Sequence, residues 1–352
     1  MKKRMYNMDL CRIAAMLGIL TLHFNLSGVL YTTEQGSSAY WMSQILEIVA
    51  FCSVNVFAML SGYLGWMKLE QKSRRLVELL FTVFFWCVVI TSLFLIFRPG
   101  DIENWKRDII GGLCPPLIGR YWYITCFIPL SLFQPYINKL LMGLSEKQER
   151  NLTAVSVILL GCIPSIFKID FFYVNLGYSF LWLAVCYSIG HYLRRIEKRV
   201  KRSHGVWIFL GGLLLQTGVK VFAYFCLHID SYYLLSYISP FIVMESIGAF
   251  IIFMHIKIEN KSAQKIVAFL AAYAFDVYIL HCHPLIFDKI ISGRFNEAVK
   301  PGMPTVLKYW LIFCISAYLL FALCGFIREK IFRILKVDFI SGKISKVIDE
   351  NL

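Results

Sequence analysis

The feature of this sequence that most constrains its fold is a series of apolar stretches, each about 18 to 25 residues long, the length that a helix needs to cross a bilayer. About ten such stretches follow one another, and hydrophobic residues make up 58% of the 352-residue chain. Charged residues make up only 16%, which excludes a soluble globular protein of this size. The sequence therefore predicts an all-α, polytopic integral membrane protein. The predicted spans cover residues 9–30, 41–66, 75–97, 120–138, 152–167, 173–193, 205–226, 237–256, 264–285 and 305–327.

The positions of the basic residues predict how these spans are oriented. Lys and Arg residues near the ends of spans remain on the cytoplasmic side of a membrane. With the N-terminus inside, most of the 36 Lys and Arg residues fall on the inner side. The inner segments are then MKKR at the N-terminus, KLEQKSRR at 68–75, the turn 139–150, RRIEKRVKR at 194–202, KIENKSAQK at 257–265 and the C-terminal tail. We therefore expect ten spans with both termini cytoplasmic, and a single transmembrane domain over residues 1–352 with no separate soluble domain.

The net charge of +14 could indicate nucleic-acid binding, but the excess lies in short turns beside the spans. Such turns contact anionic lipid headgroups, so we expect membrane lipids as partners and no nucleic acid. The 11 cysteines lie mostly as single residues within spans, without the paired spacing of a zinc site or a disulfide framework. Gly-rich phosphate loops and other cofactor motifs are absent from the sequence. The sequence thus predicts no metal site and no tightly bound cofactor.

The first span carries three polar residues in the stretch MDLCRIAAMLGILTLHF. Arg12 and His23 are eleven residues apart, which places them about 20° apart around a helix and roughly 16 Å apart along it. Asp9 precedes Arg12 by three residues and can pair with it, which lowers the cost of a charge in the membrane. One interpretation is an interfacial Asp9–Arg12 anchor with His23 bonded to a neighbouring carbonyl group. The other is a functional site, because polar groups within spans are expensive.

The predicted orientation sorts the polar residues of the spans into two levels. The outer level contains His23, Arg120, Trp122, Tyr123, Tyr278, His281 and His283, and the inner level contains Arg12, Ser61, Gly62, Arg74 and Arg75. A cationic inner level and a histidine-lined outer level favour an anionic cosubstrate from the cytosol and proton transfer further out. Alternatives remain for two segments, because GRYWY could be an aromatic belt and LSGY a small-residue contact between helices. His281 is a better site candidate than His283, which precedes a proline and is biased out of the helix.

Five segments, taken in order, resemble the acyltransferase 3 family of multispan bacterial membrane enzymes. They are the first span with Asp9, Arg12 and His23, then FAMLSGYLG, KSRRL, GRYWYITCFIPLSLFQPYINKLL and AFDVYILHCHPLI. The resemblance covers essentially the whole chain. It implies an O-acyltransferase that moves an acyl group, most often acetyl, from cytoplasmic acyl-CoA (acetyl-CoA as cosubstrate) to a hydroxyl of an extracytoplasmic or lipid-linked glycan. It also implies a multi-pass protein of a bacterial plasma (inner) membrane.

The resemblance further implies roles for individual residues. His23 would be the general base, although an acyl-histidine intermediate is also open. Arg12, with Arg74 or Arg75, would hold the CoA phosphates or the acyl carbonyl, and Ser61 would lie on the same donor side. Arg120, Trp122, Tyr123, Tyr278 and His281 would support the acceptor side. The segment KSRRL lacks a proline common in the family, so the choice between Arg74 and Arg75 stays open.

A transporter or flippase for glycan precursors is the alternative from another functional class, because polar residues at mid-membrane depth also serve carriers. Inverted halves with interrupted spans would favour a carrier, and the Gly, Pro and charge patterns show no convincing internal symmetry. A glycan polymerase would carry a large outer loop. The longest outer loops predicted here, around 98–119 and 286–304, have only about 20 residues, a length suited to gating an acceptor site.

Overall fold

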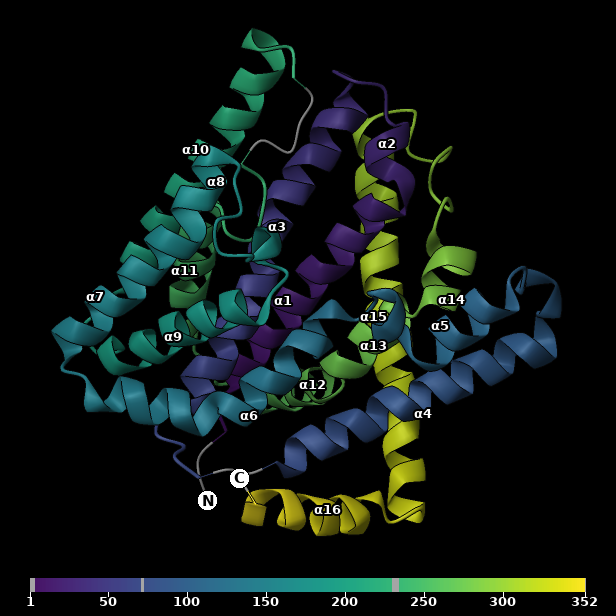
Figure 1. Ribbon diagram of the computed structural model, residues 1–352. Helices are drawn as coiled ribbons and strands as arrows, with labels where there is room; N and C mark the ends of the chain where they lie inside the picture. The colour runs from purple at the N-terminus through teal and green to yellow at the C-terminus, as the bar shows by residue number, and fades with distance from the viewer. Residues whose placement is uncertain (1–3, 71–72, 230–233, 352) are drawn as a thin grey trace. The chain divides into compact units, whose positions relative to one another are not determined.

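The computed structural model describes residues 4–70, 73–229 and 234–351 (Figure 1). Residues 1–3 and 71–72, which belong to the predicted inner segments MKKR and KLEQKSRR, lie outside this range. Helices and short helical turns make up the regular structure, and the described residues contain no strand. The prediction of an all-α chain is therefore confirmed.

The helices follow one another along nearly the whole chain. Their bounds are α1 Tyr6–Phe24, α2 Leu30–Thr32, α3 Ser38–Gly65, α4 Arg74–Phe97, α5 Gly111–Leu113, α6 Trp122–Gly143, α7 Glu146–Val157, α8 Ile163–Phe167, α9 Phe180–Ile196, α10 Arg202–Cys226, α11 Pro240–Met254, α12 Lys261–Ala272, α13 Ala274–Cys282, α14 Pro284–Ile286, α15 Met303–Ile334 and α16 Val337–Asn351. Wider π-type turns follow α1, α7 and α14, at Asn25–Val29, Ile158–Cys162 and Phe287–Ile291.

Seven helical segments are long and apolar enough to cross a membrane, counting only described residues. They are Tyr6–Thr32, Ser38–Gly65, Arg74–Phe97, Glu146–Phe167, Arg202–Cys226, Lys261–Cys282 and Met303–Ile334. Helix α11 is a shorter apolar helix, and predicted spans 120–138 and 173–193 fall largely on α6 and α9. A polytopic membrane protein is thus confirmed as the class. The total of ten spans and the cytoplasmic location of the termini stay predictions.

Two predicted spans differ from the helices observed. The span predicted from residue 173 begins at Phe180, because the Ser179 hydroxyl caps α9 by accepting the Trp182 N–H at 3.2 Å. Before it, the Asp170 carboxylate accepts the backbone N–H groups of Val174 and Asn175, each at 2.7 Å, which holds that stretch as a turn. The span predicted at 264–285 is divided at Tyr273 into α12 and α13.

The chain forms two compact units, and each is assembled from three stretches of sequence. The first unit contains residues 1–22, 44–69 and 133–271, and the second contains residues 23–43, 70–132 and 272–352. Four of the five boundaries fall inside α1, α3, α6 and α12, and the fifth falls between α3 and α4.

The first unit brings its helices close together at glycines. A Cβ added at Gly62 of α3 would lie 1.9 Å from the Tyr187 carbonyl oxygen, and one at Gly190 of α9 would lie 1.9 Å from the Met59 carbonyl oxygen. Small residues let two helix backbones approach in this way. The expected small-residue contact at LSGY is therefore confirmed, and it joins α3 to α9.

In the second unit, α13 packs against α4 and α15. Asp276 of α13 is buried. Its carboxylate accepts hydrogen bonds from Nε and Nη2 of Arg328, at 2.7 and 3.0 Å, and from Nε1 of Trp86 at 2.8 Å. A Cβ added at Gly325 would lie 2.7 Å from the Asp276 Cγ, so this glycine lets α15 approach the ion pair. The chain then bends sharply from α15 into α16 (Figure 1), which packs against α4.

Candidate active site

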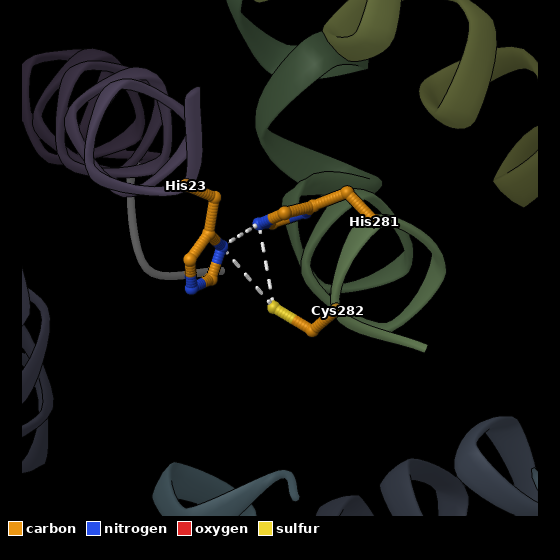
Figure 2. A group of neighbouring side chains, drawn as sticks. All are labelled: His23, His281 and Cys282. Carbon is orange, nitrogen blue, oxygen red and sulfur yellow. Dashed lines mark hydrogen bonds between the residues drawn. The ribbon is translucent and has the colours of Figure 1, made fainter. Parts of the chain in front are cut away.

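Three side chains capable of proton transfer or metal binding converge in the second unit. His23 lies in the last turn of α1, and His281 and Cys282 are the last two residues of α13. The His23 Nδ1 lies 2.7 Å from the His281 Nε2, and a dashed line joins the two atoms in Figure 2. The Cys282 Sγ lies 3.5 Å from the His23 nitrogen and 3.3 Å from the His281 nitrogen. His281 is buried, whereas His23 and Cys282 are each partly exposed.

The end of α1 is held by backbone contacts that follow His23 directly. The Gly293 N–H donates to the Ser27 carbonyl at 2.7 Å, and the Asn25 amide donates to the Ser43 carbonyl at 2.9 Å. Gly28 has φ of 128°, a conformation that strongly favours glycine. These contacts fix the turn after His23 and therefore the direction of its ring.

Helix α13 is fixed on the opposite side of the histidine pair. The Tyr121 hydroxyl donates to the Ile279 carbonyl at 2.6 Å, and the Asp276 ion pair holds the start of the helix. His283 follows α13 and is bonded at both ring nitrogens to the backbone. Its Nε2 donates to the Gly112 carbonyl at 3.0 Å, and its Nδ1 accepts the Leu285 N–H at 3.3 Å. His283 thus ends the helix with both of its ring nitrogens bonded to the backbone. His281 is therefore the histidine of this segment that contacts His23.

The hydrogen-bond pattern assigns the protons of the two neutral imidazole rings. The His281 Nδ1 lies 2.5 Å from the Val277 carbonyl oxygen, which can only accept, so this nitrogen carries the hydrogen. The His281 Nε2 is then an acceptor, and the His23 Nδ1–H donates to it. The lone pair of His23 is consequently on Nε2, which points away from His281 and Cys282 in Figure 2. The pair therefore presents a base with a fixed tautomer.

Aromatic rings surround the pair. The Tyr278 ring lies 6.1 Å from the His281 ring and 6.3 Å from the Tyr123 ring, centroid to centroid. The Phe287 ring lies 5.7 Å from the His23 ring, and the Arg120 guanidinium lies 5.9 Å from the centre of that Phe287 ring. Trp122 stacks edge-on against Tyr123 at 5.7 Å. Of the outer-level residues predicted from the sequence, Tyr278 thus adjoins the pair directly and Arg120 adjoins it through Phe287. Tyr123 connects to the pair through Tyr278, and Trp122 through Tyr123.

A cavity of about 300 Å³ opens beside Arg120. Its lining residues are Arg107, Asp108, Ile118, Arg120, Pro284, Leu285, Asp288 and Lys289. Arg120 Nη2 donates to both oxygens of Asp288, at 2.8 and 2.9 Å. Lys289 donates to Glu103 at 2.8 Å, and this hydrogen bond raises the pKa of the Lys289 ammonium. The cavity therefore offers charged donors and acceptors of both signs, the kind of lining that binds sugar hydroxyls and anionic substituents.

Two candidates of the inner level, Arg12 and Ser61, belong to the first unit. The Asp9 carboxylate accepts from Arg4 at 2.6 Å and from Arg12 at 3.2 Å, which confirms the expected Asp9–Arg12 pair. Asp9 is buried and the Arg12 side chain is 29% exposed, so the guanidinium can still reach an anionic ligand. Ser61 lies beside Gly62 at the contact of α3 with α9, and it is partly exposed.

Arg74 and Arg75 begin α4 in the second unit, and both are exposed. The Arg74 Nε donates to Glu78 at 2.8 Å, one turn further along the same helix. Arg75 forms no ion pair with any residue in the described parts of the chain. The two arginines thus differ in their partners, and Arg75 is the one whose charge is not already matched.

Sequence reasoning missed four residues of this site. Cys282 completes the cluster, Asp288 holds Arg120, and Phe287 lies near both Arg120 and His23. Tyr121 lies within the segment GRYWY, from which the sequence predicts only Arg120, Trp122 and Tyr123 as site residues. It is buried and has φ of 55°, which is unusual for a bulky residue.

Comparison with known proteins identifies the family of the chain. A family model described as an acyltransferase domain matches residues 5–329, which include parts of both units. The nodulation protein NolL of Mesorhizobium japonicum is 29% identical over 113 residues, which are 30% of this chain and 29% of NolL. The chain therefore matches less than a third of that relative's length. The comparison with solved structures found no match. With the match to the family model covering nearly all of its length, the chain belongs to the acyltransferase 3 family of membrane acyltransferases.

Proposed function

We propose that this chain transfers an acyl group, in the simplest case acetyl, from cytoplasmic acyl-CoA to a hydroxyl of an extracytoplasmic or lipid-linked glycan. The observation that carries the proposal is the His23–His281 pair, which leaves a lone pair on the His23 Nε2. The cell membrane is the expected location, with a capsule, exopolysaccharide or similar glycan as acceptor. The acyl donor is a cosubstrate that leaves after each turnover.

The chemistry can be written with these residues. The His23 Nε2 takes the proton of the acceptor hydroxyl, and the oxygen attacks the thioester carbonyl carbon. The new C–O bond forms, the C–S bond breaks, and the CoA thiolate receives the proton from the His23 imidazolium. While His23 is charged, its Nδ1–H donates to the His281 Nε2, which holds the ring in place. His281 is thus a positioning residue in this scheme, and His23 is the catalytic residue.

The charged cavity beside Arg120 supports the assignment of an acceptor side. The Phe287 ring lies near both the Arg120 guanidinium, at 5.9 Å, and the His23 ring, at 5.7 Å. A sugar seated against Arg120 and Asp288 could therefore present a hydroxyl toward the histidine pair. On the donor side, Arg12 supplies a cation for a CoA phosphate, because a guanidinium group binds phosphate oxygens in pairs.

The test is acetyl transfer from radiolabelled acetyl-CoA by the purified full chain in lipid vesicles, with cell-envelope glycans as a mixed acceptor. We expect His23→Ala to lower the rate by about 100-fold or more, the usual contribution of a general base. The matched control is His228→Ala, which changes an exposed histidine of the first unit. Equal rates for the wild type and His23→Ala would remove His23 from the mechanism. Movement of glycan across the vesicles without acyl transfer would instead indicate a carrier.

A further inference from the structure

We propose that His23, His281 and Cys282 together bind a thiophilic divalent cation of the zinc type, and that the bound cation inhibits acyl transfer. The binding part of this inference stands on the geometry of the three side chains. The inhibition part rests on the proposed function of His23. The two parts are therefore tested by separate measurements.

The distances within the cluster are close to those of a tetrahedral zinc site. Bond lengths of about 2.05 Å to nitrogen and about 2.3 Å to sulfur place an N and an S ligand about 3.5 Å apart, and two N ligands about 3.3 Å apart. The two observed N to S separations are 3.5 and 3.3 Å. The two nitrogens are 2.7 Å apart and must separate by about 0.6 Å to admit the ion. Because His23 is partly exposed, a small rotation of its ring can supply this movement.

The chemistry of the three ligands selects the kind of ion. Two imidazoles and one thiolate suit zinc and its soft relatives, whereas magnesium and calcium require oxygen ligands. His281 already has the outer-shell contact typical of a metal-bound histidine, since its Nδ1–H donates to the Val277 carbonyl. This contact aims the His281 Nε2 at the place where the ion would bind. Three protein ligands leave a fourth position for water, as in catalytic rather than structural zinc sites.

Two of the three proposed ligands are accessible. His23 and Cys282 are both partly exposed, and only His281 is fully buried. Within residues 4–70, 73–229 and 234–351, no second group of three His, Cys, Asp or Glu side chains comes as close together. The remaining cysteines therefore serve as controls. Cys324 of α15 is the control chosen, because it is also partly exposed and lies in the same unit.

Metal binding and base catalysis exclude each other at His23. The ion takes a lone pair on the His23 Nδ1, so the ring proton moves from Nδ1 to Nε2. The Cys282 thiol loses its proton to water, and one proton is released for each ion bound. With Nε2 protonated, His23 can no longer accept the proton of an acceptor hydroxyl. A bound ion would therefore stop the reaction without covering the donor site.

The binding experiment titrates the purified full chain in detergent with Co²⁺, which substitutes for Zn²⁺ and gives an absorption band when bonded to a thiolate. We expect one ion per chain with a thiolate band that Zn²⁺ displaces. Cys282→Ser should abolish the band, and His281→Ala should weaken cobalt binding at least tenfold. Cys324→Ser should leave the thiolate band and the affinity for cobalt unchanged. A band that survives Cys282→Ser, or no thiolate band in the wild type, would overturn the site.

The inhibition experiment measures acyl transfer against Zn²⁺ concentration, each variant relative to its own metal-free rate. We expect the wild type and Cys324→Ser to be inhibited at the same concentration, and Cys282→Ser to need at least ten times more Zn²⁺. Equal sensitivity of all three would overturn the inhibitory role. If the cobalt band is present but no variant transfers acyl groups, the proposed function fails and the metal site stands.

Discussion

At the scale of single residues, the site shows how a histidine can be oriented without a carboxylate. In many hydrolytic enzymes an Asp or Glu fixes the tautomer of the catalytic histidine. Here a second histidine does so, and its own tautomer is fixed by the Val277 carbonyl. The arrangement depends on His281 being an acceptor at Nε2. A side chain that offers an acceptor at the same place should replace it in part.

His281→Gln and His281→Leu test this dependence. The Gln side-chain oxygen can accept the His23 Nδ1–H, whereas Leu cannot. We expect kcat to fall about tenfold to 100-fold in the Leu variant and clearly less in the Gln variant, because only Leu leaves His23 free to adopt the wrong tautomer. Both variants should accumulate in the membrane to the same level. Equal loss of kcat in the two would show that His281 contributes packing alone.

Arg12 and Asp9 allow the donor site to be tested in the same way. Arg12→Ala should raise the KM for acyl-CoA about tenfold, because a charge-assisted contact with phosphate is lost, and it should leave the KM for the acceptor nearly unchanged. Asp9→Asn keeps the Arg12 charge and removes its ionic partner. This variant should retain acyl-CoA binding. A similar rise of both KM values in Arg12→Ala would favour a structural Asp9–Arg12 pair.

The sequence predicted most of this residue-level picture, and its limits have physical reasons. Arg12 and His23 stand out because a polar group within a membrane span is rare and costly. Cys282 does not stand out in the sequence, because a cysteine inside a span is commonly a small packing residue. Its meaning depends on a partner, His23, that lies 259 positions away in the chain. Spacing within one segment predicts no metal site, and the proposed cluster joins residues from two segments.

At the scale of helices, composition predicted the positions of the elements well and their ends less well. The sequence predicts a span from residue 173, but Tyr173, Leu176 and Tyr178 precede α9 and are exposed. Apolar residues outside a helix have the same hydropathy as those within it. The loop is set by Asp170 and the helix start by the Ser179 cap, and neither contributes to an apolar count. Capping residues would have placed the boundary correctly.

The crossing of α3 and α9 provides a test at this scale. Gly62→Ala would place a methyl group 1.9 Å from the Tyr187 carbonyl oxygen, so the helices must separate. We expect a loss of about 1–3 kcal/mol in stability, as in other overpacked cores, measured by thermal unfolding in detergent. Gly143→Ala is the control, since no atom lies within 4 Å of the added carbon. An unchanged midpoint for Gly62→Ala would mean that the crossing is more open than described.

At the scale of the whole molecule, the orientation in the membrane decides which side supplies the acyl donor. The basic segments predict an inner N-terminus, and the proposed function requires cytoplasmic acyl-CoA. Both the predicted orientation and the proposed function require the Arg12 end of α1 to lie on the cytoplasmic side of the membrane. Because the rule depends on Lys and Arg near span ends, it can be checked independently of any enzymatic activity.

Cysteine labelling from outside the cell gives that check. Glu34→Cys, Lys106→Cys and Arg294→Cys change exposed residues of predicted outer loops, and Lys198→Cys changes an exposed residue of a predicted inner turn. An impermeant maleimide should label the first three above the background of the unsubstituted chain. Lys198→Cys should react only after the membrane is opened. The reverse pattern would invert the topology and move the donor site to the outside.

The Val277 carbonyl at the end of the histidine pair has a consequence for the path of protons through the reaction. A peptide oxygen is too weak a base to accept the proton that His281 donates to it, so the chain of hydrogen bonds ends there. A proton taken from the acceptor has no onward route through His281 and must leave His23 by the nitrogen at which it arrived. Deprotonation of the alcohol and protonation of the sulfur therefore share one atom of the enzyme. In the proposed reaction, each turnover would then be a closed exchange, in which the proton that leaves the sugar is the one that appears on the thiol of CoA.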